Sequence, residues 1–138
     1  MDIEAIRILF DAGLFVLIWM IQLIVYPSFL HYSNANLNTW HQVYTKRLAV
    51  IVIPLMLGQL TLAVIQLIYN ATIENIIILI LILAIWISTF LQFVPIHNSI
   101  AKNNINKPLL HKLVRRNWFR TVLWTIILFW NIYATLLV

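Results

Sequence analysis

The chain of 138 residues contains no cysteine and only four acidic residues, and charged residues make up just 9% of it. Without cysteine it can form no disulfide, no thiolate nucleophile and no thiolate-bound metal site. A soluble globular domain typically carries about 25% charged residues. Hydrophobic residues instead reach 63% here, so the composition excludes an ordinary soluble fold.

The apolar residues gather in four blocks, each close to the ~20 residues that a helix needs to cross a bilayer. The blocks lack the alternating pattern of a membrane β-barrel. We therefore predict an all-α fold, a four-helix transmembrane bundle that forms a single domain over residues 1–138. The blocks cover Ala12–Leu30, Leu48–Tyr69, Ile76–Ile96 and Thr121–Val138.

Charge is distributed unevenly between the two predicted ends of this bundle. All four His and eight of the nine Lys/Arg fall in the first and third connections, while the four acids fall near the termini and the second connection. The positive-inside rule predicts cytoplasmic basic connections and two external termini in a bacterial inner (plasma) membrane. The formal charge of +5 then serves orientation and contact with the lipid bilayer, so no nucleic-acid partner is expected. The acidic start, with no small-residue cleavage site after the first block, does not resemble a cleaved signal.

Local signals mark helix starts and a faint internal repeat. Thr39 followed by Gln42 resembles a capping box, and Asn106 before Lys107-Pro108 is a second start signal. Pro27 and Pro95 lie near the same ends of helices one and three, which is compatible with two related hairpins.

Polar residues recur on one face of each block when the residues are rotated by about 100° each. Because polar groups facing hydrocarbon are costly, these faces are expected to turn inward and meet. In the external half of the bundle, hydrogen bonding between helices is enough to explain the polar residues. In the cytoplasmic half the polar groups exceed what packing requires, which favours a small-molecule pocket. Its predicted catalytic residues are His41, Tyr44, Arg120 and Asn117, and its predicted substrate-binding residues are Gln22, Tyr26, Gln92 and Trp124.

Single residues keep two interpretations. His41 can act as a general base or be a plain interfacial histidine, and Arg120 can hold an anionic oxygen or extend to lipid headgroups. On an ideal wheel His97 lies about 140° from Gln92, so only a distortion at Pro95 could bring it inward. Whether His97 faces the interior stays open at this point.

The motifs resemble those of the anthrone-oxygenase-like family of small four-helix integral membrane proteins. The similarity is diffuse and runs over the whole length. It rests on Trp19-x-x-Gln22-x-x-x-Tyr26-Pro27, His41-x-x-Tyr44, Pro54-x-Met56, Pro95-x-His97-Asn98 and Asn117-Trp118-x-Arg120-Thr121. The resemblance implies oxygenation of a lipophilic phenol without metal or flavin, with His41, Asn117 and Arg120 as the carried-over polar positions.

Three functions stay open from the sequence. The first is a protein that binds or oxygenates a lipophilic phenol- or quinol-type small molecule, with no cofactor and no metal. The second is a non-catalytic accessory or structural membrane protein, which a homo-oligomer would suit. The third is a haem- or metal-binding bundle, although no two His are clearly placed on facing inward stripes.

Overall fold

The structure, a computed structural model, describes residues 2–137. Over that range the chain forms helical rods joined by short turns, with no strand. The rods number four in this range, and each is long and apolar enough to cross a membrane. This agrees with the predicted all-α class and multi-pass organisation. Val138, the predicted end of the fourth block, lies outside the described residues.

The first and third rods are each assembled from several helical segments. Rod one comprises α1 (Ile3–Met20), the π-helical η1 (Ile21–Val25), α2 (Tyr26–Ser28) and the 3-10 turn η2 (Phe29–His31). Rod three comprises α4 (Ile73–Ser88), the π-helical η3 (Thr89–Phe93) and α5 (Val94–Ala101). The second and fourth rods are the single helices α3 (Asn34–Tyr69) and α6 (Lys107–Leu137).

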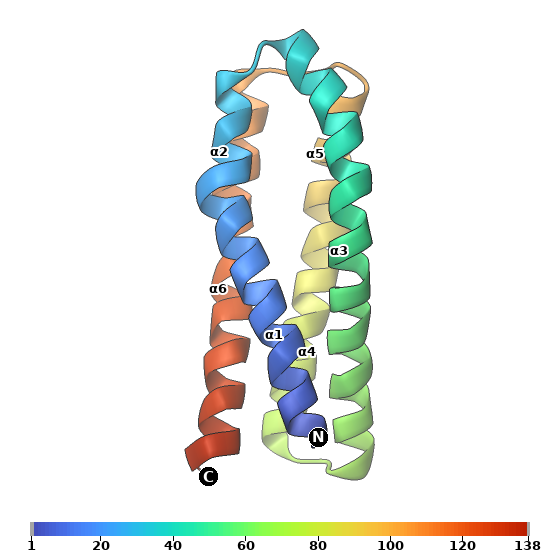
Figure 1. Cartoon of the computed structure of the whole chain (residues 1–138), viewed down its shortest axis with the longest axis vertical. Helices are drawn as coiled ribbons and strands as arrows, with labels where there is room; N and C mark the ends of the chain where they lie inside the picture. Colours follow the sequence, from blue (N-terminus) through green and yellow to red (C-terminus); the bar gives the residue numbers. More distant parts are fainter. Residues whose placement is uncertain (1, 138) are drawn as a thin grey trace.

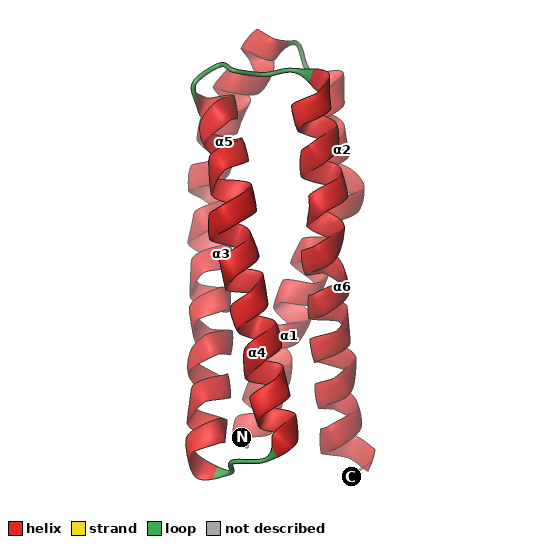
Figure 2. Ribbon diagram, turned by 180° about the vertical axis from the view of Figure 1, so that it is seen from behind, coloured by secondary structure: helices red, strands yellow, loops and turns green. Residues whose placement is uncertain are grey.

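The four rods run side by side, and successive rods point in opposite directions (Figures 1 and 2). Both termini and the α3–α4 turn lie at one end, which we call the terminal end. The α2–α3 and α5–α6 connections lie at the other end, which we call the basic end because of Lys46, Arg47, Lys102, Lys107 and their basic neighbours in α6.

The helix starts agree in part with the sequence signals. Asn106 accepts a hydrogen bond from the backbone N–H of Leu109 at 2.8 Å, so α6 begins where predicted. The Thr39 signal is wrong, because α3 already begins after Ser33, whose hydroxyl accepts from the N–H of Asn36 at 3.3 Å. Thr39 lies inside this helix and bonds back to the carbonyl of Ala35.

Both π-helical segments end two residues before a proline. η1 precedes Tyr26-Pro27 and η3 precedes Val94-Pro95. Proline has no N–H to offer the preceding turn, and one extra residue per turn is a common way for a helix to adapt to a local disturbance. Since a π-turn holds one residue more than an α-turn, it rotates everything after it relative to everything before it.

Apolar packing forms two clusters along the bundle. One surrounds Phe29, Leu37 and Phe93 towards the basic end, and the other surrounds Leu14, Ile18 and Ile82 towards the terminal end. Large apolar side chains are also exposed along the outside of every rod, the arrangement that a lipid environment requires.

Candidate functional site

The rotation at η3 places His97 inside the bundle. Its Nε2 lies 3.2 Å from the Tyr26 hydroxyl and its Nδ1 lies 2.7 Å from Nε2 of His41. The two imidazole rings are stacked with centroids 4.9 Å apart. The question that the sequence left open is therefore answered by geometry: three rods contribute to one hydrogen-bonded chain near the basic end.

Arg120 from α6 lies at the other end of this chain and is only 7% exposed. Its Nη2 donates to the Tyr26 hydroxyl at 3.3 Å and to Oδ1 of Asn117 at 2.7 Å, while Nε donates to the same oxygen at 3.1 Å. Its Nη1 donates to Thr89 at 3.2 Å, and the guanidinium carbon lies 3.5 Å from the centroid of the Phe93 ring. These contacts use all but one of the N–H donors of a guanidinium.

The hydrogen-bond partners of Arg120 within residues 2–137 are hydroxyls and an amide oxygen, and none is a carboxylate. A buried cation without a counter-charge is costly, because hydrogen bonds from neutral groups replace water only in part. The site therefore carries an uncompensated positive charge in a region that four helices shield from water.

The direction of the hydrogen-bonded chain follows from Arg120, which can only donate. The Tyr26 oxygen accepts from Arg120, so its own hydrogen is free to donate to Nε2 of His97. The Nδ1 hydrogen of His97 then points to Nε2 of His41, which leaves His41 with its hydrogen on Nδ1. That Nδ1 is buried and has no partner among the described residues. In this direction Nδ1 of His41 can only donate a hydrogen bond. It can accept one only if every hydrogen bond from Tyr26 to His41 reverses.

Two cavities open beside this chain. The lateral cavity, about 340 Å³, lies between α3 and α5 and is lined by His41, Tyr44, Thr45, Ala49, His97 and Asn98 among others. The inner cavity, about 130 Å³, is lined by Ile18, Tyr26, Thr89, Phe93, Arg120 and Trp124 among others. Leu48, Val52, Val94 and His97 line both, so His97 stands at the boundary between them.

Five of the eight residues predicted for the site line one of these cavities. His41 and Tyr44 line the lateral cavity, and Tyr26, Arg120 and Trp124 line the inner one. The Tyr44 hydroxyl is buried and, like Nδ1 of His41, finds no partner in the described part of the chain. Both unpaired atoms therefore belong to residues that line the lateral cavity.

The other three predicted residues take different positions. Asn117 and Gln22 are 0% and 2% exposed, and they bond to each other at 2.9 Å. They line neither cavity, so the predicted ligand pocket does not lie between them. Their contact instead positions Asn117, which in turn holds Arg120. Gln92 is half-buried and also lines neither cavity. The wheel placed it inward because it ignored the π-turn, which turns His97 in instead.

The haem or metal alternative gains no support from this geometry. His41 and His97 do face each other, which corrects the expectation from the stripes. However, their facing nitrogens are engaged with each other at 2.7 Å. No group of three or more His, Cys, Asp or Glu that could hold a metal ion occurs in residues 2–137.

Fold and site together define a multi-pass helical membrane protein with a buried polar site next to two cavities. Comparisons of the chain with protein-family models, curated proteins and solved structures find no match.

Proposed function

We propose that this protein lies in a bacterial plasma membrane with its basic end in the cytoplasm and its terminal end outside. The concentration of Lys and Arg at one end supports this orientation. The absence of native cysteine allows a direct test. A cysteine introduced at Ala71 should react in intact cells with a membrane-impermeant maleimide, and one at Asn104 should react only after lysis. The reverse pattern would overturn the orientation.

The function that the site supports best is binding of a lipophilic phenol- or quinol-type molecule as its oxygen anion. The observation that carries this proposal is the buried Arg120 without a carboxylate partner, on the wall of the inner cavity. An anionic oxygen there would supply the missing counter-charge and accept the remaining Nη1 hydrogen. A molecule with an apolar body would suit the rest of the lining, which is largely Leu, Ile, Val and Phe.

The lateral cavity supports entry from the bilayer rather than from water. It lies between two rods, at the level of Leu48 and Ile53, and its opening is flanked by side chains that face lipid. A lipophilic molecule concentrates in the membrane, and this route would bring it past Tyr44 and His41 before it reaches Arg120.

The same groups suit proton removal from such a molecule. If the hydrogen-bonded chain reverses, His41 donates from Nε2 to His97, His97 donates to Tyr26, and the Tyr26 hydrogen turns into the inner cavity. Nδ1 of His41 can then take the proton of a phenol or enol, and His41 becomes an imidazolium. The resulting anion moves from the lateral into the inner cavity, where it pairs with Arg120. For an anthrone-type substrate, one molecule of dioxygen converts the ring CH₂ to a carbonyl and releases one water. This balance needs no bound cofactor, in line with what the family resemblance implies.

The test uses the purified protein in lipid nanodiscs with anthrone as the probe. The enolate anion of anthrone is followed by its visible absorbance, and turnover is followed by oxygen uptake. We expect the wild type to bind the anion and Arg120→Gln to lose most of that binding, while His111→Ala serves as the control because His111 is an exposed histidine at the same end. Anion formation without oxygen uptake would support a binding protein rather than an oxygenase. Equal spectra for wild type and Arg120→Gln would refute the proposal.

A non-catalytic structural role is the second candidate. It is favoured by one observation: Gln22 donates to the carbonyl of Val114 and accepts from Asn117 and Thr121, so its side chain already serves to pack rod one against α6. In that case no small molecule binds, and Arg120→Gln changes stability alone.

A further inference from the structure

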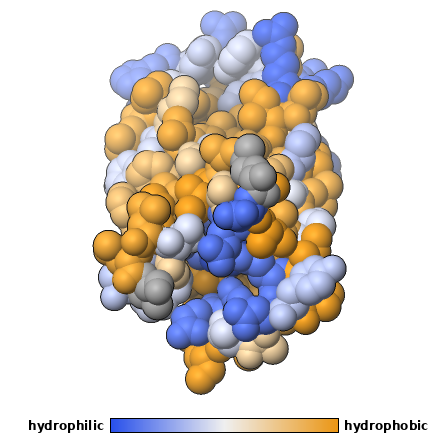
Figure 3. All heavy atoms as spheres, turned by 60° about the horizontal axis from the view of Figure 1, so that its bottom comes forward, coloured by the Kyte–Doolittle hydropathy of each residue, from blue (hydrophilic) through white to orange (hydrophobic). Residues whose placement is uncertain are grey.

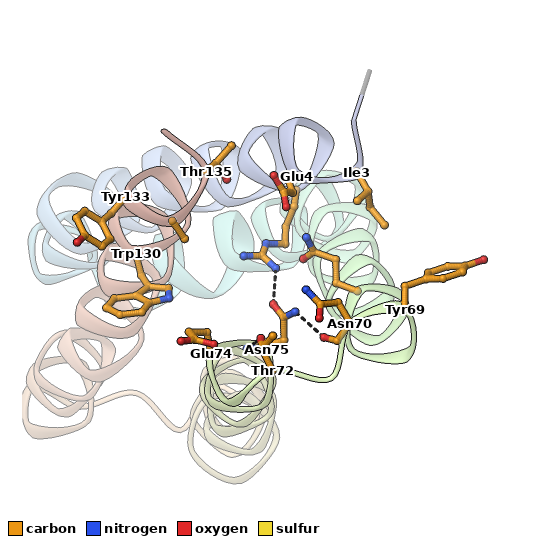
Figure 4. Close-up of a pocket in the computed structure, with 13 residues that line it drawn as sticks. Ile3, Glu4, Tyr69, Asn70, Thr72, Glu74, Asn75, Trp130, Tyr133 and Thr135 are labelled. Carbon is orange, nitrogen blue, oxygen red and sulfur yellow. Dashed lines mark hydrogen bonds between the residues drawn. The ribbon is translucent and has the colours of Figure 1, made fainter. Parts of the chain in front are cut away.

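A second polar site lies at the terminal end, far along the bundle from His41. A pocket of about 700 Å³ opens there between the start of α1, the α3–α4 turn and the end of α6. Figure 3, which brings this end forward, shows hydrophilic side chains gathered in its centre with hydrophobic surface around them. The close-up in Figure 4 shows Glu4 from α1, Glu74 and Asn75 from α4, and Trp130 and Tyr133 from α6 around the pocket, with Tyr69 turned outward.

Two buried polar atoms in the lining have no partner within the described chain. Arg7 is 6% exposed; its Nη1 donates to Asn75 at 3.4 Å and its Nη2 donates to Asn131, but its Nε is unpaired. Gln66 is 8% exposed and its Oε1 is likewise unpaired. A buried donor or acceptor left without a partner costs about 1–3 kcal/mol. The lining of the pocket thus holds a cationic donor and a neutral acceptor that no other group among the described residues uses.

The charges around the pocket specify the ligand further. Arg7 lies within the pocket wall, while Glu4 and Glu74 are exposed carboxylates at its rim. An anionic oxygen fits Arg7, and an ammonium group fits the two glutamates. Since Gln66 needs a hydrogen-bond donor, a primary ammonium fits better than a trimethylammonium, which has no N–H.

An apolar groove continues from this pocket. It has a volume of about 150 Å³ and is lined by Ile77, Ile78, Leu81 and Ile126, and it shares Glu74 and Trp130 with the polar pocket. It lies between α4 and α6, and Ile77 and Ile126 in its lining are exposed towards the surrounding membrane. A zwitterionic group followed by an alkyl chain would occupy both spaces, and Trp130 is an amphipathic residue of the kind found at headgroup level.

We propose that the terminal end binds one zwitterionic phospholipid with a primary ammonium group, its phosphate on Arg7, its ammonium between Glu4 and Glu74, and an acyl chain in the α4–α6 groove. This site is separate from the proposed phenol site and does not depend on it.

The test is native mass spectrometry of the protein released from nanodiscs that contain equal amounts of phosphatidylethanolamine, phosphatidylcholine and phosphatidylglycerol. The wild type should retain one phosphatidylethanolamine in preference to phosphatidylglycerol. Glu74→Lys, which reverses an exposed rim charge, should lower that preference about tenfold. Asp2→Lys is the matched control, because it makes the same charge change at the same end, outside the pocket lining, and it should retain the wild-type ratio.

Two further arms separate the pocket from the groove. Arg7→Gln should lose retention of all three phospholipids, with circular dichroism used to confirm that the helices remain. Ile77→Trp fills the groove from its lipid side, so it should lose phosphatidylethanolamine but keep any binding of free phosphoethanolamine. Equal retention of the three lipids by the wild type, or the same ratio in Glu74→Lys and Asp2→Lys, would overturn the site. An unchanged lipid adduct in Ile77→Trp would overturn the role of the groove.

Discussion

Asn117→Asp tests the uncompensated charge of Arg120 directly. Oδ1 of Asn117 already accepts from Nη2 and Nε of Arg120 at 2.7 and 3.1 Å, so the substitution puts a carboxylate on the guanidinium without a change of shape. The bond from the Asn117 amide to Oε1 of Gln22 is replaced by a contact between two oxygens, which the Gln22 side-chain amide relieves by turning so that its Nε2 donates to the new carboxylate. The gain of a charge pair and the cost of a second buried charge offset each other, so we expect stability within about 2 kcal/mol of wild type.

Ligand binding should respond much more strongly than stability does. An anion beyond the guanidinium, roughly 6 Å from the new carboxylate, is repelled by about 3 kcal/mol at an effective dielectric constant near 20. This corresponds to a loss of about 100-fold in affinity for the anthrone anion.

The assay is an absorbance titration in nanodiscs, with thermal unfolding measured on the same samples. Asn104→Asp, an exposed position at the same end, provides the control and should bind like wild type. An affinity for the Asn117→Asp variant within about threefold of wild type, in a protein that unfolds normally, would show that Arg120 does not hold the anion.

Two further changes probe the helix geometry. Deletion of Gln92 should convert η3 to a regular helix and rotate the residues after it by about 100°. The assay is cross-linking of cysteines introduced in place of His41 and His97. A short bis-maleimide should join them in the chain that keeps Gln92 and should fail to join them after the deletion. Gly58→Ala would place a Cβ 2.0 Å from the ring of Phe10, and the forced shift should cost about 1–3 kcal/mol in unfolding free energy. Gly13→Ala meets only the flexible end of Leu55 at 3.3 Å and should unfold within about 1 kcal/mol of wild type, so equal loss in both variants would contradict this packing.

The number of rods could be predicted from the sequence because membrane thickness sets the length of each apolar block. The helix ends could be predicted less well. Both Ser33 and Thr39 carry hydroxyls that suit a cap, and hydropathy cannot choose between them because the intervening turns are polar and lie outside the apolar block. The choice is made by the Asn-rich turns packing on rod three, where Asn38 donates to the carbonyl of Ile100 at 2.9 Å.

The inward-facing polar residues were predicted best where the helix is regular. Asn117, Arg120, Thr121 and Trp124 share one uninterrupted helix, and all four are buried as the stripe requires. The orientation of His97 had to be left open because a helical wheel assumes 3.6 residues per turn, and the π-turn before Pro95 breaks that assumption. Rods one and three each have a π-turn that ends two residues before a proline, Pro27 or Pro95. This shared feature is compatible with the faint internal repeat of two hairpins. Pro95, late in the third apolar block, was the sequence signal that allowed for such a rotation, but a proline alone does not give its size or direction.

Amide contacts between rod one and α6 link the two polar regions of the bundle. In α6, Asn117 and Asn131 are each 0% exposed, and each accepts from an arginine through its carbonyl oxygen. The Asn117 amide donates to Gln22 at 2.9 Å, and the Asn131 amide donates to Oδ2 of Asp11 at 2.5 Å. Asn131 therefore bridges Arg7 and Asp11, which the one-turn spacing alone would pair directly.

Each asparagine thus performs two tasks with one side chain: it joins α6 to rod one, and it holds a guanidinium beside a cavity. Hydrocarbon supplies no apolar driving force between helices, so such amide contacts are among the few interactions that can fix their register. The same contacts hold both buried guanidinium groups in place: Arg120 keeps one N–H without a partner among the described residues and Arg7 keeps three, so the amides that fix the register also position the donors on which both proposed sites depend.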